Sequence, residues 1–410
     1  MTKDIVVLGA GFAGLWTVIG AMRKIVEAKA QDEIKVAAVN RTPYHNIRVR
    51  NYEADLREVC VPLEDVLAPI GVDIVLGEAT DIDLARRTVT VASPAGARVL
   101  NYDRLALATG SAIARPPIPG LAEFGFDVDT YESAAKLDAH LKALARRPAA
   151  SGRYSVVVIG AGLTGIETAT AMPARLAAIR ANAPSAEPMR IIVVDRQPFV
   201  GSDMGAFARP AIEEALARLG IEQRVGAEVE RIEASGAQLT SGEWIDAMTV
   251  IWCGGMRASP LAGKMPGAHD ARGRVAVDEY LRVAGVKGVY AAGDVASLLI
   301  DGAHASVMSC QHGRPMGRFA GHNIAADLLG APLLPLRIDW YTTILDLGPA
   351  DAVYTAGWDR RVIASGAAAK ATKRTINGKR IYPPRSRNAA EILAAAAPTV
   401  QKPPEIGGGI

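Results

Sequence analysis

The chain has 410 residues, of which 50% are hydrophobic, and a formal net charge of +3 at pH 7. A chain of this length can bury a large core and should divide into roughly two or three domains. The small net charge gives no indication of nucleic-acid binding. Cys60, Cys253 and Cys310 lie far apart and form no C-x-x-C pair. This argues against a disulfide scaffold, a zinc knuckle or a short dithiol loop and suits a reducing compartment, although spatial pairing of distant cysteines stays open.

An apolar run that opens into G-x-G-x-x-G occurs twice, each time followed by a stretch that suits a helix. Such a strand, turn and helix hold a pyrophosphate, because the glycines let it approach the backbone at the helix N-terminus. The strand that follows each copy is also similar, at 36–43 and 191–198. Two dinucleotides are therefore expected to bind at once. The predicted contacts are Gly9, Gly11, Phe12, Ala13 and Gly14 in the first copy and Gly160, Gly162, Thr164 and Gly165 in the second.

The segment from Ile5 to Met22 runs for 18 positions without a charge, which is close to the length of a membrane span. Its glycines favour a buried nucleotide-binding unit instead. The first residues also lack the basic region and cleavage site of a signal peptide. We therefore expect no exported or membrane-spanning segment here.

Further elements follow in chain order. A second strand is expected at 34–40, and short strands at 72–76, 87–91 and 99–107 are predicted to form a small antiparallel layer. The proline-rich segment 115–120 leaves this block, and the second unit occupies about 154–256. A buried strand at 288–294 ends in Gly-Asp, and from about residue 330 a third, smaller domain carries a short helix at 388–397.

In this order, the landmarks resemble the two-dinucleotide-domain flavoprotein reductases over about residues 3–328. The resemblance implies an α/β fold with two Rossmann-like three-layer dinucleotide-binding domains and a small C-terminal α+β domain. The implied boundaries are 1–115 and 256–328 for the FAD domain, 116–255 for the inserted NAD(P)H domain and 329–410 for the C-terminal domain. By the same resemblance, FAD occupies the Gly9 loop, flanked by Thr109, Gly110, Gly293 and Asp294, and NAD(P)H occupies the Gly160 loop.

Two segments resemble type II NADH:quinone dehydrogenases more closely, Asn40–His45 and Leu163–Thr168, and Trp252–Gly255 and Trp358–Arg360 fit the same pattern. The resemblance implies hydride transfer from NADH to FAD and electron transfer to a quinone or quinone-like acceptor. Two catalytic residues follow from it: Glu167, near the nicotinamide and flavin rings, and Gln311, at the quinone site. The family has a second Gln where this chain has Val307, so the acceptor is open to differ. Further cofactor contacts implied are Asn40, Arg41, His45 and Gly255.

The strand ends bear on nucleotide choice. Asn40 stands where an acidic residue usually binds the ribose, so adenosine binding is expected to be weaker, unless Asn40 is merely a surface residue. Asp195 holds the corresponding place in the second unit and favours NADH over NADPH, because a carboxylate repels a 2′-phosphate. Arg196 follows it and could instead reach such a phosphate.

Several charged and polar residues have two interpretations. Arg48 and Arg50 could bind an anionic acceptor or reduced flavin, or form ion pairs with Glu53, Asp55 or Glu58. Backbone N–H groups at a helix start within 308–316 are expected to stabilise the reduced flavin, with Pro315 either opening or kinking that helix. His45, His312 and Cys310 are secondary candidates near the acceptor. A basic cluster could contact anionic lipid, although a solvated basic face is favoured; it comprises Lys370, Lys373, Arg374, Lys379, Arg380, Arg385 and Arg387.

Two other functions stay open. One is a soluble reductase of a ferredoxin-like protein or another small acceptor, which the basic cluster would suit. The other is a non-catalytic nucleotide-sensing module. Sulfide:quinone chemistry needs paired cysteines, which the spacing does not support. No metal site is predicted. The expected location is cytoplasmic, with peripheral contact at the membrane and association into a homodimer left open.

Overall fold

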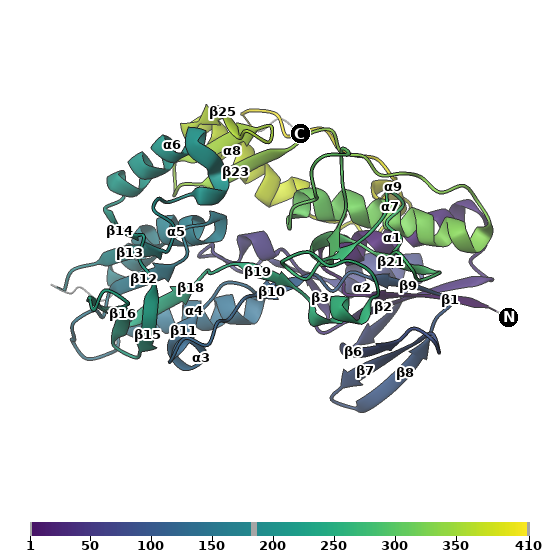
Figure 1. Cartoon of the computed structure of the whole chain (residues 1–410), viewed down its shortest axis with the longest axis horizontal. Helices are drawn as coiled ribbons and strands as arrows, with labels where there is room; N and C mark the ends of the chain where they lie inside the picture. The colour runs from purple at the N-terminus through teal and green to yellow at the C-terminus, as the bar shows by residue number, and fades with distance from the viewer. Residues whose placement is uncertain (1, 182–186, 408–410) are drawn as a thin grey trace.

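The computed structural model describes residues 2–181 and 187–407, and two five-stranded parallel sheets organise this part of the chain (Figure 1). The sheet order is β21-β9-β1-β2-β5 in one and β11-β18-β12-β13-β14 in the other. The first comprises β1 (Lys3–Leu8), β2 (Ile34–Asn40), β5 (Asp73–Leu76), β9 (Arg104–Leu107) and β21 (Val289–Ala291). The second comprises β11 (Gly125–Phe126), β12 (Ser155–Ile159), β13 (Arg190–Asp195), β14 (Ile221–Val225) and β18 (Thr249–Trp252). Parallel sheets with helices on their faces confirm the predicted α/β class.

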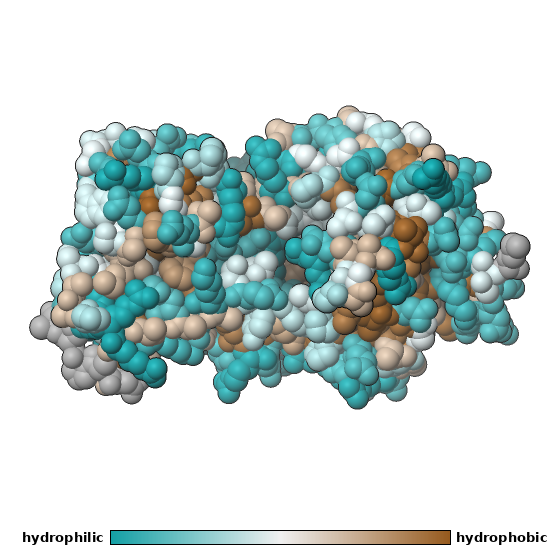
Figure 2. Space-filling model, turned by 90° about the horizontal axis from the view of Figure 1, so that it is seen from below, coloured by the Kyte–Doolittle hydropathy of each residue, from teal (hydrophilic) through white to brown (hydrophobic). Residues whose placement is uncertain are grey.

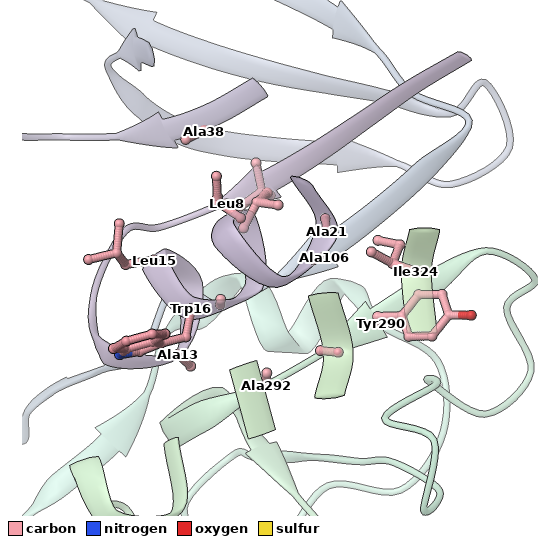
Figure 3. Packing of buried hydrophobic residues seen from close by; sticks show 14 of the residues in the cluster. Leu8, Ala13, Leu15, Trp16, Ala21, Ala38, Ala106, Tyr290, Ala292 and Ile324 are labelled. Atoms are coloured by element: carbon pink, nitrogen blue, oxygen red, sulfur yellow. The ribbon is translucent and has the colours of Figure 1, made fainter. Parts of the chain in front are cut away.

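Helices α1 (Phe12–Glu27) and α7 (Cys310–Leu329) pack against each other on the first sheet. Glycines on α7 make this contact very close. A Cβ atom added at Gly317 would lie 2.2 Å from the carbonyl oxygen of Ala13, and one at Gly321 would lie 2.2 Å from that of Thr17. The start of α7 is therefore held beside the start of α1. Figure 3 shows Ala13 and Trp16 of α1 on the side away from Leu8 and Ala38 of the sheet.

Helices α3 (Leu121–Phe124), α4 (Tyr131–Leu144), α5 (Leu163–Ala181) and α6 (Gly205–Arg218) accompany the second sheet, together with an antiparallel layer of β15 (Val229–Glu233), β16 (Gly236–Leu239) and β17 (Trp244–Asp246). Two short strands connect the sheets. Strand β10 (Ser111–Ile113) leaves the first unit and pairs antiparallel with β19 (Met256–Ala258), which returns to it. The chain thus leaves and re-enters the first unit through one ribbon, and the exact domain boundaries stay a prediction.

The C-terminal part contacts both halves of the molecule: its sheet lies against α5 and α6, whereas its last helix lies against α1 (Figure 1). Its sheet contains β23 (Thr342–Asp346), β24 (Ala352–Ala356) and β25 (Arg361–Ser365), followed by α8 (Gly366–Thr375), a π-helical turn (Ile376–Arg380) and α9 (Ala389–Ala395). The short helix predicted at 388–397 is therefore present. Smaller elements are β3 (Tyr44–Asn46), β4 (Cys60–Pro62), α2 (Leu63–Leu67), β6 (Glu78–Asp83), β7 (Thr88–Ser93), β8 (Gly96–Asn101), β20 (Val275–Ala276) and β22 (Ala296–Ser297).

One predicted layer was partly wrong. Only β7 and β8 of the predicted strands join an antiparallel layer, with β6, whereas β5 and β9 belong to the first parallel sheet. The run predicted at 99–107 is broken by Tyr102 and Asp103, and the Asp103 carboxylate accepts a hydrogen bond from the backbone N–H of Asp4 at 2.8 Å. This bond fixes β9 beside β1. The buried, continuous apolar residues of β9 are typical of a parallel strand rather than of an alternating one.

Two other expectations concern helices. The uncharged run from Ile5 to Met22 forms β1, a turn and most of α1, and no helix in residues 2–181 or 187–407 is long and apolar enough to cross a membrane. Helix α7 starts at Cys310, inside the predicted window, and Pro315 lies within the helix rather than opening it.

The surface in Figure 2 mixes hydrophilic and hydrophobic residues, with a notch between the halves that hold the two sheets.

Candidate functional site

The first glycine loop has the geometry of a phosphate cradle. Gly9 adopts φ +94°, and a Cβ atom there would lie 2.4 Å from the carbonyl oxygen of Ala108. A Cβ atom at Gly14 would lie 1.9 Å from the carbonyl oxygen of Gly9, whereas Gly11 faces open space. No side chain caps the N-terminus of α1, so its first N–H groups are available to an anion. These residues fit the pyrophosphate of a dinucleotide.

The second loop repeats this geometry at the start of α5. Gly160 adopts φ +104°, and a Cβ atom there would lie 2.7 Å from the carbonyl oxygen of Cys253. A Cβ atom at Gly165 would lie 1.7 Å from the carbonyl oxygen of Gly160. Thr164 between these glycines is exposed, and Gly162 is partly exposed. The second loop therefore also fits a pyrophosphate.

Asn40 and Asp195 close the two loops in the same way. Asn40 Oδ1 accepts a hydrogen bond from the N–H of Ala10 at 3.0 Å, and Nδ2 donates to the carbonyl of Thr42 at 2.8 Å. The Asp195 carboxylate accepts hydrogen bonds from the N–H groups of Ala161 and Gln197. Asn40 is thus more than a surface residue, since it holds the loop, while the ribose contacts of both residues stay predictions.

Arg48 links the two units beside the predicted flavin site. Its guanidinium forms an ion pair with Asp129 and donates to the carbonyl oxygen of Ser111 at 3.2 Å. The Ser111 hydroxyl in turn donates to Asp294 at 2.7 Å. The prediction that Arg48 forms ion pairs with nearby acidic residues is therefore wrong, because its partners are distant in sequence. Arg50 does pair locally, with Glu53 at 2.6 Å.

Several buried polar atoms near the first loop have no hydrogen-bond partner among the described residues, including His45 Nε2, Thr109 Oγ1 and Gln311 Nε2. His45 Nδ1 lies 2.9 Å from the carbonyl oxygen of Ala10, so Nδ1 carries the proton and Nε2 is a bare acceptor. Burial lowers the pKa of His45 to about 4, which keeps the ring neutral at pH 7. Such atoms suit a polar ligand held against the loop.

A buried charge network surrounds Glu167. Its Oε1 accepts hydrogen bonds from Lys373 Nζ at 2.7 Å and from the backbone N–H of Asp346 at 3.0 Å. Lys370 Nζ lies 2.6 Å from the Asp346 carboxylate, which also accepts a hydrogen bond from the Tyr52 hydroxyl at 3.1 Å. Burial lowers the pKa of Lys373, but attraction to Glu167 and Asp346 outweighs burial and leaves that pKa raised. The lysine therefore stays charged.

The solvated basic face was consequently wrong for Lys370 and Lys373, which are 9% and 7% exposed. Their three-residue spacing on α8 places both on one side of the helix, a signal that could have predicted a shared buried role. Nothing in the sequence indicated that Asp346 and Tyr52 belong to this buried network, because a single Asp or Tyr in a strand or loop is not part of a recognisable motif. Two further predicted contacts, Arg41 and Gly255, remain predictions: the Arg41 side chain is exposed and lies 3.9 Å from the Glu78 carboxylate, and Gly255 adopts φ +87°.

We expect Asn40→Asp to weaken the first loop. The carboxylate keeps the acceptor for Ala10 but removes the donor to Thr42, so two oxygen atoms face each other. The loss should be about 1–3 kcal/mol of unfolding free energy. Urea denaturation measures it. Asn388→Asp is the control, because Asn388 caps α9 only as an acceptor. Equal behaviour of the two variants would contradict this role of Asn40.

We also expect stability to fall in mild acid. Unfolded His45 binds a proton near pH 6.5, whereas folded His45 does so only near pH 4. The unfolded state therefore gains stability as the pH falls through this window, by up to about 3 kcal/mol. His45→Asn keeps a donor for Ala10 and cannot titrate, so its denaturation midpoint should depend less on pH. His269→Gln, at an exposed site, should behave like the wild type. An unchanged pH dependence in His45→Asn would contradict the assignment.

The model of the pyridine nucleotide-disulphide oxidoreductase family matches residues 3–317. An NADH dehydrogenase-like protein of Mycobacterium tuberculosis is 54% identical, with 98% of this chain and 100% of that protein covered. A type II NADH:quinone oxidoreductase of Staphylococcus aureus is 25% identical, with 86% of this chain and 89% of that protein covered.

A similar fold occurs in the solved structure of NDH2 from Plasmodium falciparum in complex with NADH. The TM-score is 0.78 at 13% identity, with 96% of this chain and 98% of that chain covered. Family membership implies a flavin and NAD(H). The chain therefore belongs to the pyridine nucleotide-disulphide oxidoreductase family and is an enzyme of the two-dinucleotide-domain flavoprotein class that its glycine loops predict.

Proposed function

We propose that this enzyme is an FAD-dependent NADH dehydrogenase that delivers electrons to a quinone. One observation carries the proposal: strand β23 contacts both predicted catalytic residues. Thr342, at its start, donates to Gln311 Oε1 at 3.4 Å, and Asp346, at its end, donates its N–H to Glu167. A single strand thus supports the starts of α5 and α7, the helices of the nucleotide and flavin sites.

The roles of the protein follow from these positions. FAD would lie on the Gly9 loop and NADH on the Gly160 loop, and the flavin would accept a hydride and pass on two electrons. Glu167 would orient the nicotinamide side, while Lys373 holds the carboxylate in place. Gln311 Nε2 would donate to the acceptor oxygen. The overall reaction consumes NADH, one proton and a quinone and yields NAD⁺ and a quinol.

The relatives support this acceptor. The Staphylococcus proteins are named type II NADH:quinone oxidoreductases, and a Synechocystis relative, 28% identical, is named a demethylphylloquinone reductase. Chemistry through paired cysteines has no support in this chain. Cys60, Cys253 and Cys310 are free, and burial raises the pKa of Cys60 to about 11 and that of Cys253 to about 12. These two thiols stay protonated and weakly nucleophilic at pH 7.

Anaerobic stopped-flow measurement of flavin absorbance separates the two half-reactions. NADH should bleach the flavin, and a short-chain quinone should restore it. Glu167→Gln should slow bleaching about tenfold or more, because it removes the carboxylate that orients the nicotinamide and leaves Lys373 as an unpaired buried charge. Gln311→Leu should leave bleaching unchanged and slow reoxidation about tenfold, the effect of one lost hydrogen bond.

Glu222→Gln and Gln238→Leu, away from both sites, are the matched controls. A flavin that NADH reduces but no quinone reoxidises would move the acceptor to another class. A chain that retains no FAD when supplied with it would contradict the whole proposal.

A further inference from the structure

Two arginines on α7 are buried against an aromatic ring. Arg314 and Arg318 are 6% and 3% exposed, and their guanidinium carbons lie 5.2 Å and 4.4 Å from the centre of the Trp16 ring. The four-residue spacing places them on one face of the helix, together with Cys310 one turn earlier. Buried arginine normally pairs with a carboxylate or phosphate, because burying an unpaired charge is costly.

No such partner exists in the part of the chain that the structure describes. Both Nε–H groups are buried without an acceptor, and no carboxylate among the described residues shifts the pKa of either arginine. The charged neighbours of both arginines are mainly other arginines. Burial, Arg318 and Arg380 lower the pKa of Arg314 to about 9, and burial and Arg380 lower that of Arg318 to about 10. Three cations therefore lie close together here, and among the described residues the Cys310 thiol is the one acidic group that raises the pKa of Arg314.

This cluster adjoins the predicted flavin site. Arg314 is close enough to His45 and to Cys310 to shift their pKa values, and His45 touches the glycine loop through Ala10. Phe12, the first residue of α1, packs edge-on against the His45 ring at 5.0 Å. The arginines and Gln311 thus project from the first turns of the same helix.

We propose that Arg314 and Arg318 bind an acidic group on the electron acceptor, so that the enzyme prefers an anionic quinone over a neutral one. The inference rests on the proposed function and narrows its substrate class. Two planar guanidinium groups supply the donors that a carboxylate or sulfonate needs. The reaction is unchanged: NADH and one proton reduce the quinone to the quinol, and the acidic group keeps its charge throughout.

Two other anions fit less well. A lipid headgroup at a membrane surface would meet exposed arginines, whereas these two are almost fully buried. The glycine loop and the free N–H groups of α1 would bind the FAD pyrophosphate, whereas Trp16 and Arg318 lie one turn beyond that loop. The acidic group of a molecule that enters the protein is therefore the occupant that the burial favours.

The test compares two acceptors of the holoenzyme, neutral menadione and anionic naphthoquinone sulfonate. Arg314→Gln and Arg318→Gln should each raise the KM for the sulfonate about tenfold and leave the KM for menadione within about twofold. Arg361→Gln is the matched control, since Arg361 also stacks on a ring, that of Phe207, but is 67% exposed. Arg314→Lys keeps the charge and should lose less than Arg314→Gln, which separates anion binding from misfolding.

Calorimetric binding of the sulfonate to the oxidised enzyme gives a readout without turnover. The wild type should bind it, and the two glutamine variants should bind it about tenfold more weakly. Loss of FAD from those variants, measured as the flavin-to-protein absorbance ratio, would assign the arginines to the cofactor and overturn the proposal. Equal effects on both quinones would overturn it too. If menadione is reduced and the sulfonate shows no preference, the inference fails while the quinone function stands. If neither quinone is reduced, the proposed function fails and the inference fails with it.

Discussion

The close approach of backbone to backbone in the two glycine loops is the constraint on which the site depends. At Gly14 and Gly165 a side chain would overlap the carbonyl of the first loop glycine, so the helix start could not fold back onto its strand. The same turn brings free N–H groups to the carboxyl edge of each sheet. Both predicted cofactor positions follow from this turn, as does the hydrogen bond that an N–H group of each loop donates to Asn40 or Asp195.

The C-terminal part completes the site from the other side. Compared with apolar residues, a buried ion pair adds little net stability, but one buried charge left alone costs about 3–5 kcal/mol. The pairs of Glu167 with Lys373 and of Asp346 with Lys370 therefore fix where α8 and β23 sit on α5. Positioning, rather than stability, is the consequence, since β23 also contacts Gln311. The buried arginines of α7 lie outside these pairs and have no such counter-charge among the residues that the structure describes.

The sequence predicted what local patterns encode. The glycine loops, the strands that precede them and the start of α7 all depend on short segments with strong conformational requirements. The prediction of the antiparallel layer was partly wrong, because short apolar runs are compatible with parallel and antiparallel sheets alike. The hydrogen bond from the backbone N–H of Asp4 to the Asp103 carboxylate, which fixes β9 beside β1, leaves no such pattern in the sequence. The partners of Lys373 and of Arg48 could not be predicted, since both lie more than 60 positions away in the sequence. No periodicity records such long-range pairs.

The central claim is that one chain binds two dinucleotides at once, each through its own glycine loop. Native mass spectrometry of the purified chain with FAD and NAD⁺ tests it most directly, because the mass added to the chain identifies each ligand. The wild type should carry one FAD and one NAD⁺, and Gly165→Val should keep FAD and lose NAD⁺, since its side chain would meet the Gly160 carbonyl. A single dinucleotide per chain, or loss of FAD from Gly165→Val, would contradict the account.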